Sequence, residues 1–586
     1  MAFHWTFHSF LLLFVTLLGV TAATDCTADA FQAFLPSNAS INFIYPIQGP
    51  NGTFGDPADN DFGANATHLP DLCTVSIKIT IPGNSFSFGL FLPDKWNNRL
   101  IGTGNTGFGG GINWPYMGHL VNYGMVAFST DTGHNSGPSD AAWAYGADTQ
   151  QTDWGYYAMH ESVLMAKQVI TSYYSSQIDY SYYMACSGGG RQGMKEMQNY
   201  PDDFNGYAIG APPWLLSHLH VWAAYVGVVN VPNTTASHIS EDLLSNLTDV
   251  VTAICDPQDG VSDGTIAEPW SCDFNSTMLL CNGNNAPICL TPEQLPTFDK
   301  IAGDWYDDKG NLVFPSFMLG ADMSGLGGGD TPSGFGTQYI DNFLYNNTNW
   351  NYTTVSPETV AQADSLDAGS GNADNFDLSP LKAAGGKVMM YHGLADPLIP
   401  PGSTIYYYEQ VQRTMGNTDD FYRFFTIPGM HHCSGSYGAP YYIGGGGQKL
   451  DDGVYSVPGF VDPQHDIVLA VMNWVENGTA PDSLIATKFK GNLVANGVLK
   501  QAPLCPYPKR AIYQGHGNIN DPDNWQCGTA TALSLPTMTI AERGSVSISP
   551  NPVMPSRPAD SGSTNLQITW SSHLLVLACL TVVLAW

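Results

Sequence analysis

A serine among very small residues is the first candidate for chemistry in this sequence. Ser187 lies in the stretch MACSGGGRQG (184–193), after a short apolar run and before a helix-like segment. A strand-to-helix turn of this kind exposes the serine hydroxyl in a strained backbone conformation, and it requires almost no side chain two positions before and after. Ala185 and Gly189 meet that need, although the usual pattern has glycine at both. The stretch predicts a nucleophilic serine, with a glycine-rich turn after a buried strand as the plainer interpretation.

A histidine and an acid supply the other groups that a nucleophilic serine needs. His432 lies in GMHHC (429–433), and Asp396 follows an apolar run in KVMMYHGLADP (387–397). The order serine, aspartate, histidine along the chain is that of α/β-hydrolases, in which the histidine takes the serine proton and the acid orients the histidine. His431 is the alternative base, and either histidine could instead be a core residue. The adjacent Cys433 favours His432.

Two cysteines lie next to these residues. If Cys186 and Cys433 were bonded, their Cα atoms would lie about 4.4–6.8 Å apart, and each neighbouring residue about 3.8 Å further along. Ser187 and His432 would then have Cα atoms no more than about 14 Å apart. A bond here would remove most of the loop-closure uncertainty between two segments that are more than two hundred residues apart.

This pairing of Cys-Ser, Asp and His-Cys resembles the signature of the tannase and feruloyl esterase family, and matches extend from about residue 70 to 530. The resemblance implies an α/β fold, namely an α/β-hydrolase core with a large inserted lid domain. It also implies a secreted serine carboxylesterase that forms an acyl-enzyme and needs no organic cofactor. Its substrates would be feruloyl and other hydroxycinnamoyl esters of plant cell-wall polysaccharide, or galloyl esters of tannins. The rival hypothesis is a catalytically silent, hydrolase-like glycoprotein of the cell surface or wall, and the intact Ser187, Asp396 and His432 speak against it.

The glycine-rich segment GTGNTGFGGG (102–111) also resembles the family. In acyl transfer, such glycines let backbone N–H groups approach the developing oxyanion, a role that we expect for Gly107 and Gly188. The segment also reads as GxGxxG, and Asp131 lies at about the distance of a ribose-binding acid. A dinucleotide site requires a helix that opens at the third glycine. More glycines and Pro115 follow instead, so we reject that interpretation.

The elements around these residues follow from the hydrophobic pattern. Alternating apolar residues in 75–81 and 86–92 predict an antiparallel hairpin. An amphipathic helix over 153–168 and a helix over 190–200 are expected on either side of the serine strand. Asp462 and Pro463 predict the N-cap and first turn of an apolar helix through Trp474.

Hydrophobic pattern and composition together divide the chain into segments. The apolar run 11–20 before Thr-Ala-Ala predicts a signal peptide over 1–23. Residues 24–213 and 385–535 form the predicted catalytic domain, and an insertion as long as 214–384 is most simply a lid. A Ser/Pro-rich linker follows at 536–563. Residues 564–586 resemble a GPI-attachment signal, because the apolar end is too short to span a bilayer and small residues precede it. A degenerate tail anchor or a disordered end is the alternative.

A calcium site is expected inside the predicted lid. The stretch CDPQDGVSDGTI (255–266) holds three carboxylates within eight residues, with no Lys or Arg before Cys272. Hard oxygen ligands on tight turns suit Ca²⁺, although the spacing is not that of an EF-hand. The family resemblance implies calcium at this kind of segment, and an acidic solvated turn is the alternative. The expected ligands are Asp256, Asp259 and Asp263, with the backbone carbonyls of Val261 and Thr265.

Charge and cysteine content indicate a secreted protein. The net charge is −31, and only 20 Lys and Arg are available to neutralise phosphates, which argues against nucleic-acid binding. Loss of the tail would remove Cys579 from eleven cysteines and leave ten, enough for five bridges in an oxidising compartment. Besides Cys186 with Cys433, plausible pairs are Cys26 with Cys73, Cys255 with Cys272, Cys281 with Cys289, and Cys505 with Cys527, but sequence leaves the connectivity open.

Glycosylation sequons point to the same compartment. Nine Asn-x-Ser/Thr sequons occur, at Asn38, Asn51, Asn65, Asn233, Asn246, Asn275, Asn346, Asn351 and Asn477. Lys509-Arg510 is either a processing site or an ordinary surface pair. The sequence therefore predicts a glycosylated extracellular enzyme, either free or held at the cell surface by a GPI lipid.

Overall fold

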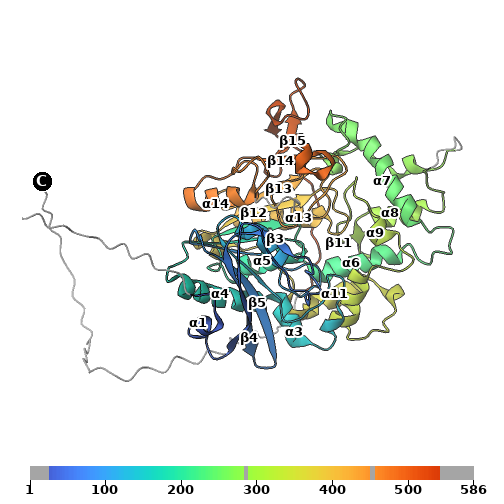
Figure 1. Ribbon diagram of the computed structural model, residues 1–586. Helices are drawn as coiled ribbons and strands as arrows, with labels where there is room; N and C mark the ends of the chain where they lie inside the picture. Colours follow the sequence, from blue (N-terminus) through green and yellow to red (C-terminus); the bar gives the residue numbers. More distant parts are fainter. Residues whose placement is uncertain (1–24, 283–287, 449–455, 542–586) are drawn as a thin grey trace, which may run out of the picture. The chain divides into compact units, whose positions relative to one another are not determined.

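The computed structural model describes residues 25–282, 288–448 and 456–541 (Figure 1). These residues belong to one compact unit, Met1–Arg543. The expected signal peptide (1–23), the GPI-attachment-like segment (564–586) and all but the first residues of the linker lie outside the described residues. Within the described part of the chain, no helix has the length and apolar character needed to cross a bilayer.

The centre of the described chain is a nine-stranded sheet with the order β1-β4-β5-β7-β6-β8-β9-β12-β13. In chain order these strands are β1 (Ala39–Ile47), β4 (Leu72–Ile81), β5 (Asn84–Pro93), β6 (Arg99–Gly102), β7 (Val126–Thr130), β8 (Tyr180–Cys186), β9 (Gly206–Gly210), β12 (Lys387–Gly393) and β13 (Tyr422–Ile427).

The sheet is antiparallel at one end and parallel over the rest. β1, β4, β5 and β7 pair antiparallel, and β4 with β5 is the hairpin predicted from the alternating apolar residues. All pairs from β7 and β6 through to β12 and β13 are parallel. Because parallel strands end at the same edge, the loops after β8, β12 and β13 meet there. This is the α/β-hydrolase arrangement, and it confirms the predicted fold class.

Helices cover both faces of the sheet, and each face has its own hydrophobic core. Side chains of a strand point alternately to the two faces, so in β8 Tyr183 enters the first core and Tyr182 the second. The first core is covered by α4 (Ala158–Tyr174), α5 (Gly188–Asn199) and α13 (Pro401–Met415), and the second by α2 (Trp114–Val121) and α14 (Ile467–Asn477).

The start of α14 differs from the sequence prediction. Its N-cap is Asp466, whose side chain accepts hydrogen bonds from the backbone N–H groups of Val468 and Leu469. The Asp462 side chain instead accepts from the backbone of Gln464 and His465 and closes a separate turn. Asp462-Pro463 therefore precedes the helix, whose C-cap Gly478 has the left-handed conformation.

The segment between β9 and β12, for which a lid is expected, forms helices joined by loops and one small sheet (Figure 1, green to yellow). Its apolar side chains, such as Trp222 and Phe314, belong to the same core as Tyr406 of α13, so the insert is packed onto the hydrolase part. Its elements are α6 (Leu216–Val228), α7 (Glu241–Cys255), α8 (Leu295–Ala302), β10 (Trp305–Tyr306), β11 (Leu312–Phe314), α9 (Ser324–Gly327), α10 (Gly334–Tyr339), α11 (Pro357–Leu366) and α12 (Ser379–Ala383).

Small two-stranded sheets and short helices complete the unit. They are β2 (Gly52–Phe54) with β3 (Ala66–Leu69), β14 (Leu484–Phe489) with β15 (Val498–Leu504), β16 (Arg510–Tyr513) with β17 (Trp525–Gly528), and the helices α1 (Ala28–Gln32) and α3 (Asp148–Thr152). Within the described residues, five disulfides join the pairs that the sequence made plausible: Cys26–Cys73, Cys186–Cys433, Cys255–Cys272, Cys281–Cys289 and Cys505–Cys527.

Candidate active site

Ser187 occupies a sharp turn between β8 and α5. Its backbone has φ 61° and ψ −132°, a conformation that is unusual for a residue with a side chain. A Cβ atom added to Gly189 would lie 2.7 Å from the Cβ of Ala185, which is too close for two carbons. The turn therefore tolerates alanine at one of the two flanking positions because glycine occupies the other. The half-buried Ser187 hydroxyl stands at the carboxyl edge of the sheet.

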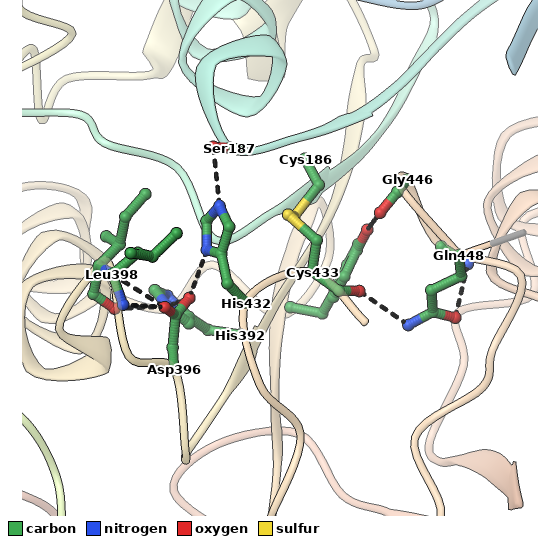
Figure 2. Close-up of a disulfide and its surroundings, with 12 residues drawn as sticks. Cys186, Ser187, His392, Asp396, Leu398, His432, Cys433, Gly446 and Gln448 are labelled. Carbon is green, nitrogen blue, oxygen red and sulfur yellow. Dashed lines mark hydrogen bonds and ion pairs between the residues drawn. A yellow bond between two sulfur atoms is a disulfide. The ribbon is translucent and has the colours of Figure 1, made fainter. Parts of the chain in front are cut away.

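Ser187, His432 and Asp396 form a continuous chain of hydrogen bonds (Figure 2). Nε2 of His432 lies 2.8 Å from Oγ of Ser187, and Nδ1 of His432 lies 2.7 Å from Oδ2 of Asp396. The carboxylate accepts, so Nδ1 carries the proton, and Nε2 is left as the acceptor for the serine hydroxyl. This is the geometry that a general base needs.

His431 takes no part in this chain. Its ring packs edge-on against Tyr437, with ring centroids 4.7 Å apart. Burial lowers the pKa of His431 below its ordinary value. The structure thus distinguishes the two adjacent histidines that sequence left as alternatives, and places His432 beside the serine.

Asp396 is fully buried and also contacts a second histidine, His392, which no sequence pattern marked. Nε2 of His392 lies 3.0 Å from Oδ2 of Asp396, and Nδ1 lies 2.9 Å from the hydroxyl of Thr404. The other carboxylate oxygen accepts from the backbone N–H groups of Leu398 and Ile399. Burial alone would raise the pKa of Asp396, but the two histidines outweigh it and hold that pKa well below the ordinary value. The acid therefore stays ionised.

A disulfide ties the serine turn to the histidine loop. Cys186 and Cys433 have Cα atoms 5.9 Å apart, within the range of an ordinary disulfide (Figure 2). The segment after the histidine loop then closes over this bridge: a Cβ on Gly446 would lie 2.7 Å from the backbone nitrogen of Cys186. The Gln448 amide donates to the carbonyl oxygen of Cys433. Gly446 and the Gln448 side chain thus pack against the two halves of the bridge.

The expected oxyanion residues lie next to each other. A Cβ atom on Gly188 would lie 3.0 Å from the backbone nitrogen of Gly107, and both residues line the same cavity as Ser187. Neither backbone N–H donates a hydrogen bond among the described residues. Gly107 has φ +47°, and an added Cβ would lie 2.2 Å from the carbonyl oxygen of Pro138, so only glycine fits there.

A cavity of about 530 Å³ opens at the serine. Besides the glycine-rich segment, the serine turn and the histidine loop, residues of α6, α10 and the loop after β12 line it, and no sequence pattern marked these. The apolar part of the lining includes Leu216, Leu219, Ala223, Phe335, Leu398 and Ile399. A cavity of this size and character suits an apolar or aromatic group bound beside the serine hydroxyl.

The acidic lid stretch forms a folded loop. Oδ1 of Asp256 accepts from the backbone N–H groups of residues 263, 264 and 265, and Asp259 accepts from those of 261 and 267. Asp259, Val261, Asp263 and Thr265 line one cavity of about 70 Å³, whereas Asp256 lines a neighbouring one. The ammonium group of Lys500 enters the first cavity and pairs with Asp263. Four of the five expected ligands are therefore brought together, and a lysine already compensates part of their charge.

Comparison with known proteins shows which family has this architecture. The family model described as "Tannase and feruloyl esterase" matches residues 75–528. The chain belongs to this family. Among its relatives, a protein named "Probable feruloyl esterase B-2" from Neosartorya fischeri is 31% identical over 536 residues, covering 88% of this chain and 99% of the relative. "Probable feruloyl esterase B-1" from Aspergillus oryzae is 32% identical over 527 residues, covering 87% and 94%.

Solved structures of the tannase and feruloyl esterase family have the same fold. The crystal structure of feruloyl esterase B from Aspergillus oryzae superimposes with a TM-score of 0.78 at 29% identity, covering 86% of this chain and 99% of that one. Tannin acyl hydrolase from Aspergillus niger, at 23% identity and a TM-score of 0.67, covers 87% and 97% and shares the fold. As a member of this family, the chain is a carboxylic ester hydrolase.

Proposed function

We propose that this chain is a secreted feruloyl esterase that hydrolyses hydroxycinnamoyl esters of plant cell-wall polysaccharide. The observation that carries the proposal is the aligned set of Ser187, His432 and Asp396, of which Ser187 and His432 line a largely apolar cavity. The names of the relatives support it. Galloyl esters of tannins are the second candidate, since the family includes both activities.

The geometry assigns each residue a role in acyl transfer. His432 removes the proton of the Ser187 hydroxyl as its oxygen attacks the ester carbonyl. Asp396 holds the imidazole in the required tautomer and stabilises the imidazolium that forms. The alcohol leaves with the proton from His432. Water then gives a proton to His432 as its oxygen attacks the acyl carbonyl, and the acid is released when the bond to Ser187 breaks and the serine oxygen takes that proton back.

The backbone N–H groups of Gly107 and Gly188 stabilise the oxyanion. They are adjacent, they have no backbone acceptor among the described residues, and they line the cavity beside the serine. Fixed donors of this kind act where charge develops and need no reorganisation during the reaction.

The walls of the cavity favour a hydroxycinnamoyl group over a galloyl group. Gallate carries three hydroxyl groups, each of which needs a hydrogen-bond partner when buried. Several polar side chains of the lining already bind protein: the Asn113 amide donates to the carbonyl oxygen of Gly104, and the Tyr116 hydroxyl to that of Gly445. A feruloyl group has a single hydroxyl and an extended apolar body, which the lining matches better.

Hydrolysis of methyl ferulate and methyl gallate by the purified chain tests this proposal. We expect a larger kcat/KM for methyl ferulate. A larger value for methyl gallate would favour the tannin-directed activity, and no turnover of any aryl ester by folded protein would favour a catalytically silent surface glycoprotein.

The proposed location is outside the cell. Five disulfides fit an oxidising compartment. Of the nine sequon asparagines, all are exposed except Asn38, which is half-buried, so their side chains are open to a glycan. Attachment to a GPI lipid at the cell surface is testable by phospholipase treatment of membranes, and failure to release the protein would count against it.

We also propose a structural calcium ion in the lid. The candidate donors are hard oxygen ligands of the type that this metal prefers, because Asp259, Val261, Asp263 and Thr265 line one cavity, which Lys500, Lys509 and Arg510 also line. Asp256 would act by folding the loop through its three backbone hydrogen bonds. Bound calcium would cross-link the loop and stabilise the lid, and Lys500 would compete for Asp263.

A further inference from the structure

His220 is a polar side chain in the apolar part of the cavity beside Ser187. It projects from α6 and is 7% exposed. Its ring is stacked between Phe108 and Tyr339, with ring centroids 4.7 and 4.8 Å away. The interplanar angles are 27° and 21°, so two aromatic side chains fix the plane of the imidazole.

The imidazole of His220 is neutral and has an unused nitrogen. Burial lowers the pKa of His220 to about 3, against a smaller opposite effect of a hydrogen bond with the backbone of Phe335. A neutral imidazole has one donor and one acceptor nitrogen. The ring N–H that faces the Phe335 carbonyl leaves the other nitrogen as an acceptor. No donor among the described residues is hydrogen-bonded to that nitrogen, and the residue lines the cavity.

Arg191 adds a fixed positive charge to the same cavity. It is 1% exposed, stacks on Trp154 at 4.2 Å, and donates to the backbone carbonyls of Gly155 and Gly371. Its charge also lowers the pKa of His220 and helps to keep the imidazole neutral. The cavity therefore combines apolar walls with an immobile hydrogen-bond acceptor.

We propose that His220 is a specificity-determining residue that accepts a hydrogen bond from the phenolic hydroxyl of the substrate's acyl group. The inference rests on the proposed function and deepens it, because it specifies the acyl groups that are preferred. The phenolic O–H of an aromatic acyl group can donate a hydrogen bond to a single acceptor on an aromatic-lined wall. An acyl group without that hydroxyl would leave the buried nitrogen unpaired, which is the arrangement that gives strong discrimination.

Three methyl esters test this with the wild-type chain alone: 4-hydroxycinnamate, 4-methoxycinnamate and unsubstituted cinnamate. The measured quantity is kcat/KM for each. We expect 4-hydroxycinnamate to exceed the other two by about tenfold, the effect of one net hydrogen bond. Equal values for 4-hydroxycinnamate and 4-methoxycinnamate would overturn the inference while leaving the esterase function intact. Absence of hydrolysis of all three would overturn the proposed function, and the inference with it.

Two variants assign the effect to His220. His220→Phe keeps an aromatic ring between Phe108 and Tyr339 but removes the acceptor, so the ratio of kcat/KM for 4-hydroxycinnamate to that for cinnamate should fall about tenfold. His220→Gln keeps an acceptor oxygen and should retain most of the ratio. Because each variant is judged by the ratio of its two kcat/KM values, a loss of activity toward both esters cancels. Thermal unfolding shows whether each variant is folded. An unchanged ratio in folded His220→Phe, or an equal fall in both variants, would contradict the assignment.

Discussion

Nε2 of His432 lies 2.8 Å from Oγ of Ser187, although 245 residues separate them along the chain. The disulfide between the residue before the serine and the residue after the histidine holds these two loops together across that separation. A covalent bond between the two loops restricts the movement of the nucleophile relative to the base.

Removing that disulfide should reduce both stability and activity. The double variant Cys186→Ala, Cys433→Ala opens a loop of 247 residues. The gain in chain entropy of the unfolded state should lower the free energy of unfolding by about 5 kcal/mol. We expect a lower midpoint in urea unfolding and, in the fraction that stays folded, a fall in kcat, because the hydroxyl and imidazole are no longer held together.

The matched control is the double variant Cys26→Ala, Cys73→Ala. It opens a loop of 47 residues far along the chain from the site, at a cost of about 4 kcal/mol. Its folded fraction should keep the kcat of the wild type. Equal kcat in the two double variants would show that the bridge at the site acts on stability alone.

The position of the active-site residues could be read from the sequence because each lies in a local pattern. Ser187 lies among the very small residues that a strand-to-helix turn of this kind requires, and His432 is marked by its neighbouring cysteine. The cavity could not be read in this way. His220, Phe335 and Leu398 come from three separate segments, and only the packing of the insert brings them together. The start of α14 was misplaced because Asp462-Pro463 has the residue types of an N-cap, while the turn geometry that decides between Asp462 and Asp466 is tertiary.

His392 is predicted to position Asp396. In His392→Phe, the carboxylate loses one of its hydrogen bonds and part of the positive field that lowers its pKa. A hydrogen bond to a charged group contributes about 1.5–3 kcal/mol, so kcat should fall about tenfold or more. KM should change little, because His392 does not contact the cavity. Thr404→Val, which removes only the partner on the far side of the ring, is the milder control. Wild-type kcat in folded His392→Phe would contradict the role.

Calcium binding should compete with Lys500. Elemental analysis of wild-type protein should find about one calcium per chain, and chelation should lower the unfolding temperature. Lys500→Met removes the ammonium group that pairs with Asp263, so the affinity for calcium should rise. Absence of bound calcium in both the wild type and this variant would refute the site.

Glu196 should make stability fall with rising pH. It is fully buried beside Asp203, and burial, together with the charge of Asp203, raises the pKa of Glu196 well above 4.5. The folded chain then keeps a proton that the unfolded chain loses, so the free energy of unfolding decreases as pH rises from about 4.5 towards the raised pKa, by at most about 1.4 kcal/mol per pH unit. The neighbouring His160, Lys167 and Lys195 are the same in every variant compared.

Glu196→Gln removes this proton and should flatten the pH dependence above about pH 4.5. Urea unfolding at several pH values measures it. The control is Glu241→Gln at an exposed position, which should keep the wild-type slope. Parallel slopes for wild type and Glu196→Gln would mean that Glu196 is ionised in the folded chain.

The most direct test of the serine mechanism is to identify the covalent intermediate. The enzyme is mixed with methyl ferulate, quenched in acid within the first turnover and digested, and the peptides are analysed by mass spectrometry. We predict one feruloyl group on Ser187 of the wild-type chain and none on any residue of Ser187→Ala, whose kcat should fall at least about 10⁴-fold. A feruloyl group on another residue, or full turnover by Ser187→Ala, would contradict the assignment of Ser187 as the nucleophile.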